Sequence, residues 1–211
     1  RKQDLAQKEI KQAELEMLKT ASAAGTIDLC YLDESGFCQW SDSSYSYYFR
    51  GEQKRQEQTK SRGERISILG IWQPMVAFLY TLVVGSLKSH HYVAMLNAQA
   101  EEAELERKKS GKIRVIVQDN GSIHLSKYTQ KHWEEWRAKG LYLFFLPPYC
   151  SEMNPIELEW LHLKRDELAG RMFSDTPELA YHVVQGIENR AAKNGHVAQF
   201  LSVEPALQIV T

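Results

Sequence analysis

Short apolar runs, rich in β-branched and aromatic residues, recur along this chain and limit what it can fold into. Each run has 6 to 11 residues, which suits a β-strand and is far below the roughly 20 residues that cross a bilayer. We expect strands at 27–33, 66–72, 75–85, 112–119 and 141–146. Apolar side chains occupy both faces of the first run, IDLCYLD, so this strand should lie at the centre of a sheet.

Polar segments of helical composition separate most of these runs. Residues 1–24 are dominated by Ala, Glu, Lys and Gln with a thin apolar stripe, which predicts a linker helix or arm rather than a core element. Further helices are expected at 90–109, 126–139, 154–169 and 176–194. This order predicts an α/β protein whose mixed five-stranded sheet has helices on both faces. It is the element order of the RNase H-like fold.

The composition is that of one ordinary globular domain. Of the 211 residues, 43% are hydrophobic and 25% are charged. We place the domain at 25–195, after the helix at 1–24 and before a tail at 196–211. No segment resembles a signal peptide or a membrane span, so no membrane partner is expected. An odd number of cysteines without metal-like spacing favours a reducing compartment, here the cytoplasm.

A basic stretch stands out more than the net charge of −1. Its basic residues are Arg50, Lys54, Arg55, Lys60 and Arg62. The simplest interpretation is a solvated loop. The alternative is a loop whose side chains contact the phosphates of a nucleic acid. The sequence leaves both interpretations open.

Two of the expected strands end in an aspartate. Asp33 ends the first strand, in YLDES, and Asp119 ends the fourth, in VIVQDNGSIH. If these strands are adjacent and parallel, both carboxylates meet at the sheet edge where ligands gather in open α/β sheets. Either aspartate alone is more often just the point where a strand meets a loop. Glu34 is a weaker candidate because it points to the opposite face of its strand.

A third acid, Glu157, lies in LPPYCSEMNPIELEW, where a helix is expected to begin. Asn154 suits the N-cap and Pro155 suits the first helical position, so Glu157 would complete a capping box. A capping role is compatible with a site role, because a side chain in the first helical turn can be held beside a sheet edge. Glu152 and Glu159 compete with Glu157 for that role.

Three carboxylates at one place repel each other and favour a bound cation. Oxygen ligands without a His or Cys cluster favour Mg²⁺ or Mn²⁺ over zinc. Two such ions about 4 Å apart could activate a water or a 3′-hydroxyl and stabilise the leaving oxygen of a phosphodiester. His90 and His91 would point about 100° apart on a helix, which disfavours them as a chelating pair.

Several ordered motifs make the chain recognisable. YLDESGF, QDNGSIH, LPPYCSEMNPIELEW and LHLKRDEL resemble the DDE transposases of the Tc–mariner superfamily, in particular its bacterial insertion-sequence branch. RGEQ at 50–53 and ILGIW are similar to the family's intervening segments. The 37 residues between Asp119 and Glu157 lie within the family's usual spacing. The resemblance covers about residues 25–175.

This resemblance implies that Asp33, Asp119 and Glu157 are catalytic residues that hold two Mg²⁺ or Mn²⁺ ions. Asn120 and His124 match the DN-x-x-H part of the second motif; they would contact DNA or support the site, or serve only local structure. The implied reaction is cleavage at transposon ends and strand transfer into target DNA. The implied partners are double-stranded DNA, as ends and as target, and further copies of the chain in a dimer or larger assembly. The place of action would be the bacterial cytoplasm, at the nucleoid.

Two other functions stay open. The chain could be an RNase H-like nuclease that only hydrolyses, or a catalytically silent DNA-binding module. Complete family members also carry N-terminal helix-turn-helix domains that bind the transposon ends, and there is no room for them ahead of Asp33. We therefore expect specific end recognition to be missing or supplied by another segment.

Overall fold

The computed structural model describes residues 5–39 and 63–203, and one mixed sheet forms their centre. The strand order is β5-β4-β1-β2-β3-β6. The strands are β1 (Ile27–Phe37), β2 (Ile66–Gln73), β3 (Ala77–Val84), β4 (Ile113–Gln118), β5 (Leu141–Phe145) and β6 (Val197–Phe200). The neighbours β1, β2 and β3 are antiparallel, whereas β4 pairs in parallel with both β1 and β5.

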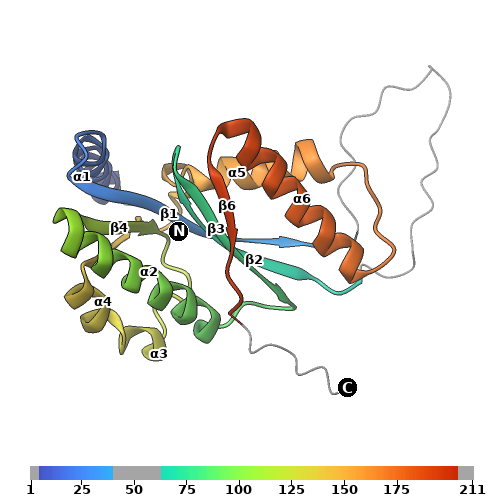
Figure 1. Cartoon of the computed structure of the whole chain (residues 1–211), viewed down its shortest axis with the longest axis horizontal. Coiled ribbons are helices and arrows are strands. Elements are labelled where there is room, and N and C mark those ends of the chain that lie inside the picture. The colour runs from blue at the N-terminus through green and yellow to red at the C-terminus, as the bar shows by residue number, and fades with distance from the viewer. Residues whose placement is uncertain (1–4, 40–62, 204–211) are drawn as a thin grey trace.

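Helices cover both faces of this sheet, as the sequence predicts (Figure 1). They are α1 (Leu5–Ala23), α2 (Ser89–Ser110), α3 (Lys127–Gln130), α4 (Trp133–Lys139), the 3-10 turn η1 (Ser151–Met153), α5 (Ile156–His162), the π-helical η2 (Leu163–Leu168) and α6 (Thr176–Asn194). On one face, α2 and α4 bury Leu96 and Trp136. On the other, α1, α5 and α6 bury Leu15, Trp160 and Val183.

The strands expected at 66–72 and 75–85 form the β2–β3 hairpin. Its register runs without a break from Ile66 opposite Val84 to Gln73 opposite Ala77. The end of the helix expected at 126–139 is also present: Gly140, with a φ of 90°, ends α4 in the left-handed region that glycine adopts at no cost. These local signals were sufficient because each depends on residues close in sequence.

Some predicted boundaries differ from the structure. β1 does not end at Asp33 but continues to Phe37, because these residues still pair with β2 after β4 has ended. The helix expected at 126–139 is divided into α3 and α4. The helix expected at 154–169 begins at Ile156 and widens into the π-helical η2 from Leu163.

Within the part of the chain that the structure describes, the sheet has six strands rather than the predicted five. Val197–Phe200 form β6, parallel to β3, in the segment 196–211 that was expected to be a tail. Four residues carry too weak a pattern to predict a strand; the free edge of β3 supplies the hydrogen-bonding partners. In the predicted arm at 1–24, Leu15 is only 2% exposed and lies in the core. The helix α1 is therefore packed on the sheet.

No helix in residues 5–39 or 63–203 is both long and apolar enough to cross a membrane.

Candidate active site

The register of two parallel strands brings Asp33 and Asp119 to one edge of the sheet. β1 and β4 are adjacent and parallel, which is the condition that the sequence argument required. Their last register pair is Tyr31 opposite Val117, and each aspartate lies two residues beyond it. Asp33 is still within β1, opposite Gly70 of β2, whereas Asp119 follows β4 directly.

Glu157 approaches the same edge from the first turn of α5. Asn154 does not cap this helix with its side chain as predicted. Its side-chain amide instead donates a hydrogen bond of 2.9 Å to the carbonyl of Leu32, and its side chain is buried. The start of α5 is thereby fixed to β1 one residue before Asp33, so the distance between Glu157 and β1 depends on this bond.

Asp33, Asp119 and Glu157 all line one hollow of about 410 Å³. Asp33, Asp119 and Glu157 share it with Asn120 and with the loop from Leu146 to Ser151. A second hollow adjoins the first, since Asp33 and Glu157 line both. Arg65 and Lys164, both exposed, line this second hollow. The surface therefore has an acidic centre with two basic side chains on one flank.

The carboxyl of Asp33 lies in a largely buried position. Burial raises the pKa of its carboxyl to about 7, and the charges of Glu157 and Asp119 act in the same direction. The indole Nε1 of Trp160 donates a 3.0 Å hydrogen bond to Asp33 Oδ2. An ionised Asp33 is therefore unfavourable without a counter-charge, and a bound cation would supply one.

Asp119 is held by His124. The imidazole Nδ1 lies 3.0 Å from Asp119 Oδ1, while Nε2 lies 3.0 Å from Glu34 Oε1 on the other side of the ring. The hydrogen bond with His124 lowers the pKa of Asp119, and the Gly121 N–H, which donates at 2.8 Å, acts in the same direction. Burial alone would lower the pKa of His124, but Asp119 and Glu34 outweigh it and raise that pKa to about 9.

The geometry favours a supporting role for His124 over contact with DNA. Its side chain is only 1% exposed, and its ring packs against Tyr92 with centroids 4.6 Å apart and ring planes tilted by 37°. Asn120 lines the hollow, but its side-chain amide donates to the carbonyl of Leu146 at 2.5 Å. That bond connects the turn after Asp119 to the end of β5.

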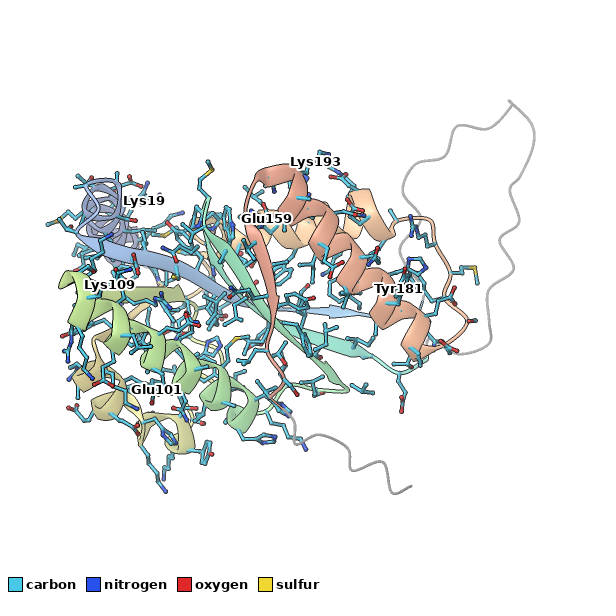
Figure 2. The ribbon with its side chains drawn as sticks, viewed as in Figure 1. Lys19, Glu101, Lys109, Glu159, Tyr181 and Lys193 are labelled. Atoms are coloured by element: carbon cyan, nitrogen blue, oxygen red, sulfur yellow. The ribbon has the colours of Figure 1, made fainter. Side chains whose placement is uncertain are left out.

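The competing acids are engaged elsewhere. Glu159 forms an ion pair of 2.7 Å with Arg190, with side chains only 13% and 11% exposed; Figure 2 shows Glu159 beside α6. Glu152 forms an ion pair of 2.6 Å with Lys8 of α1. Glu157 is therefore the acid of α5 that lines the hollow.

The donor set suits a hard divalent cation, because it consists of carboxylate oxygens that oppose one another's charge. In the described parts of the chain, no three His, Cys, Asp or Glu side chains are grouped closely enough to form a ready-made metal site. Asp119 is turned towards His124 and Asp33 towards Trp160. The fit to Mg²⁺ or Mn²⁺ rests on ligand chemistry and on the shared hollow.

The sequence did not reveal every residue of this surface. Trp160 was not among the candidate site residues; it packs edge-on against Phe78, at 5.4 Å and 87°, and also donates a hydrogen bond to Asp33. Lys164 was not singled out, although it lies two helical turns after Glu157, on the same face of the helix. The predicted basic residues Arg50, Lys54, Arg55, Lys60 and Arg62 lie outside the described residues.

Comparison with known proteins places the chain in a family and identifies structures of similar fold. Residues 28–180 match the model of a family described as the DDE superfamily endonucleases. A search of curated protein sequences gave no match.

Three solved structures of similar fold come from the Mos1 mariner transposase. The paired end complex with Mn matches at 14% identity and a TM-score of 0.63, covering 92% of this chain and 63% of that chain. The Mos1 Strand Transfer Complex matches at 15% identity and 0.59, covering 92% and 62%. The isolated Mos1 catalytic domain matches at 10% identity and 0.53, covering 92% and 96%. This chain thus has the fold of that catalytic domain and spans just under two thirds of the longer chains.

Proposed function

We propose that this chain, which belongs to the DDE superfamily endonucleases, is the catalytic core of a DNA transposase. The family match covers most of its length. Its reaction would be cleavage of phosphodiester bonds at transposon ends, followed by transfer of the freed 3′-hydroxyl into target DNA. The observation that carries the proposal is the convergence of Asp33, Asp119 and Glu157 on one hollow, from two adjacent parallel strands and one helix.

We propose that Asp33, Asp119 and Glu157 hold two Mg²⁺ or Mn²⁺ ions. When bound, such ions activate the attacking oxygen and stabilise the leaving oxygen of the phosphodiester. The protein would orient the carboxylates: His124 and Gly121 fix Asp119, Trp160 fixes Asp33, and Asn154 fixes the start of α5. Mos1 paired end complexes are known with Mg and with Mn, which supports this choice of metal.

The DNA strand would lie along the two adjoining hollows. Arg65 and Lys164 flank the carboxylates on one side, where they can neutralise phosphates next to the bond that is cut. Asn120 lines the other part of the groove and could contact the strand through its carbonyl oxygen, since its amide is already engaged. The basic residues at 50, 54, 55, 60 and 62 lie outside the described residues, and on charge alone we propose that they contact DNA phosphates.

Assembly and location belong to the same proposal. Mos1 is described in paired end and strand transfer complexes, which supports double-stranded DNA, as ends and as target, and a dimer or larger assembly as partners. An origin in a bacterial insertion sequence, and action at the nucleoid, rest on the sequence resemblance alone.

The deciding experiment measures cleavage and joining in one reaction. The chain is incubated with supercoiled plasmid and a labelled duplex oligonucleotide bearing a free 3′-hydroxyl, with Mg²⁺, with Mn²⁺ or with chelator. We expect metal-dependent nicking of the plasmid and covalent joining of the labelled strand. Nicking without joining would instead indicate a nuclease that only hydrolyses.

Two variants assign the reaction to the site. Asp119→Asn keeps the shape of the side chain but removes its charge, so it should abolish both products. Glu152→Gln is the matched control, because Glu152 pairs with Lys8 away from the hollow, and it should leave both products unchanged. Equal activity in the parent chain and in Asp119→Asn would overturn the assignment. A parent that binds DNA and metal without making either product would indicate the silent DNA-binding module.

A further inference from the structure

The hydrogen bond between Trp160 and Asp33 joins α5 to β1 across 127 positions of sequence. The indole Nε1 donates to Asp33 Oδ2 at 3.0 Å, and Trp160 is only 3% exposed. An indole N–H can donate but not accept, and it cannot ligate a cation. Its bond to a carboxylate is charge-assisted and therefore stronger than a bond between neutral groups. Its effect is to hold one Asp33 oxygen in a defined direction.

The surroundings of Trp160 hold its ring in place. Phe78 of β3 packs edge-on against it, with ring centroids 5.4 Å apart. Gly70, the register partner of Asp33 in β2, leaves the space that the ring occupies: a Cβ at position 70 would come within 2.6 Å of the indole Cη2. The ring therefore rests on the backbone directly opposite Asp33. A residue needed only to fill the core would not require an N–H at this point.

We propose that Trp160 is a positioning residue that orients the Asp33 carboxylate for metal binding before the metal arrives. This inference rests on the proposed function, in which Asp33 is a metal ligand. Trp160 also stands one helical turn after Glu157, so the same short helix supplies one carboxylate and orients another. Any movement of α5 would displace both together.

The test is Mn²⁺ binding to the metal-free chain, measured by electron paramagnetic resonance, without reference to turnover. Trp160→Phe keeps an aromatic ring and removes the donor. We expect its Mn²⁺ affinity to fall by about tenfold or more, the usual effect of removing a partner that orients a metal ligand. The matched control is Trp133→Phe, because the buried Trp133 N–H has no hydrogen-bond partner among the described residues. That variant should bind Mn²⁺ like the parent.

Loss of packing must be separated from loss of the donor. The isostere 3-benzothienylalanine at position 160 replaces N–H by sulfur and keeps the shape of the ring, so it should fold like the parent and still bind Mn²⁺ weakly. Parent-like affinity in this isostere would overturn the positioning role and leave the proposed function intact. A parent whose Mn²⁺ binding is absent, or is unaffected by Asp119→Asn, would overturn the proposed metal site itself.

Discussion

The side-chain amide of Asn154 donates a 2.9 Å hydrogen bond to the carbonyl of Leu32, although 122 positions of sequence separate them. The bond is buried, and it sets where α5 begins relative to β1. It therefore controls the distance between a helix that carries Glu157 and a strand that carries Asp33.

Asn154→Ala should destabilise the chain by about 1–3 kcal/mol, because the buried Leu32 carbonyl loses its side-chain donor. Metal-dependent nicking should fall further than this loss of stability explains, since the start of α5 is no longer fixed to β1. Chemical denaturation and the plasmid assay measure the two effects. Asn189→Ala, which removes only an exposed contact with Glu167, is the control and should change neither. Parent-like nicking in a destabilised Asn154→Ala chain would contradict the coupling.

Asp33→Asn should stabilise the metal-free chain at pH 8 by roughly 1–3 kcal/mol. At this pH, above the raised pKa of about 7, the buried carboxyl is ionised beside two other acids, and the neutral amide removes that cost. Thermal unfolding with and without Mg²⁺ checks the prediction. Mg²⁺ should raise the melting temperature of the parent and leave the variant almost unchanged. A variant that is less stable than the metal-free parent would show that ionisation of the Asp33 carboxyl does not destabilise the fold.

Glu159→Gln and Glu157→Gln should have opposite effects. Glu159→Gln leaves Arg190 without its counter-charge in a mostly buried pair and should cost about 2 kcal/mol or more of stability. Glu157→Gln should leave stability nearly unchanged but abolish metal-dependent nicking. Urea denaturation and the plasmid assay, run on both variants, distinguish the roles of these two acids. The reverse pattern would assign the catalytic role to Glu159.

Gly70→Ala should destabilise the chain by about 1–3 kcal/mol, because the added methyl group collides with the benzo ring of Trp160. In a Trp160→Phe background the atoms at 2.6 and 2.8 Å are absent, so the same change should cost much less. A double-mutant cycle by denaturation measures this coupling. Additive effects would show that Gly70 is not there to accommodate the indole.

The cysteines should differ sharply in reactivity. Burial raises the pKa of the Cys30 thiol to about 12, so it carries almost no reactive thiolate at neutral pH. Cys150 is only 2% exposed, whereas Cys38 is partly exposed. Iodoacetamide followed by mass spectrometry should modify Cys38 first in the native chain, and all three thiols in urea. Early modification of Cys30 would show that β1 opens locally.

Much of the fold could be predicted because it depends on local patterns. Apolar runs predicted five of the six strands found in residues 5–39 and 63–203. The sixth strand could not be predicted, because Val197–Phe200 form a strand only where the edge of β3 is available. The extension of β1 past Asp33 is likewise due to pairing with β2, whose partner residues lie 29 to 35 positions away in the sequence.

The sequence by itself determined the candidate carboxylates: Asp33 and Asp119 follow apolar strands, and Glu157 lies at a helix start with a recognisable motif. It left Glu152 and Glu159 as alternatives to Glu157, because acids close together in sequence cannot be ranked without knowing which of them form ion pairs with basic side chains. Only the tertiary structure decided that Glu159 pairs with Arg190 and Glu152 with Lys8. It also decided that Trp160, Asn154 and His124 fix the elements and carboxylates of the site. Hydrogen bonds between residues over 100 positions apart, such as those of Trp160 and Asn154, leave no periodic trace in a sequence, since they arise only when separate elements are packed together.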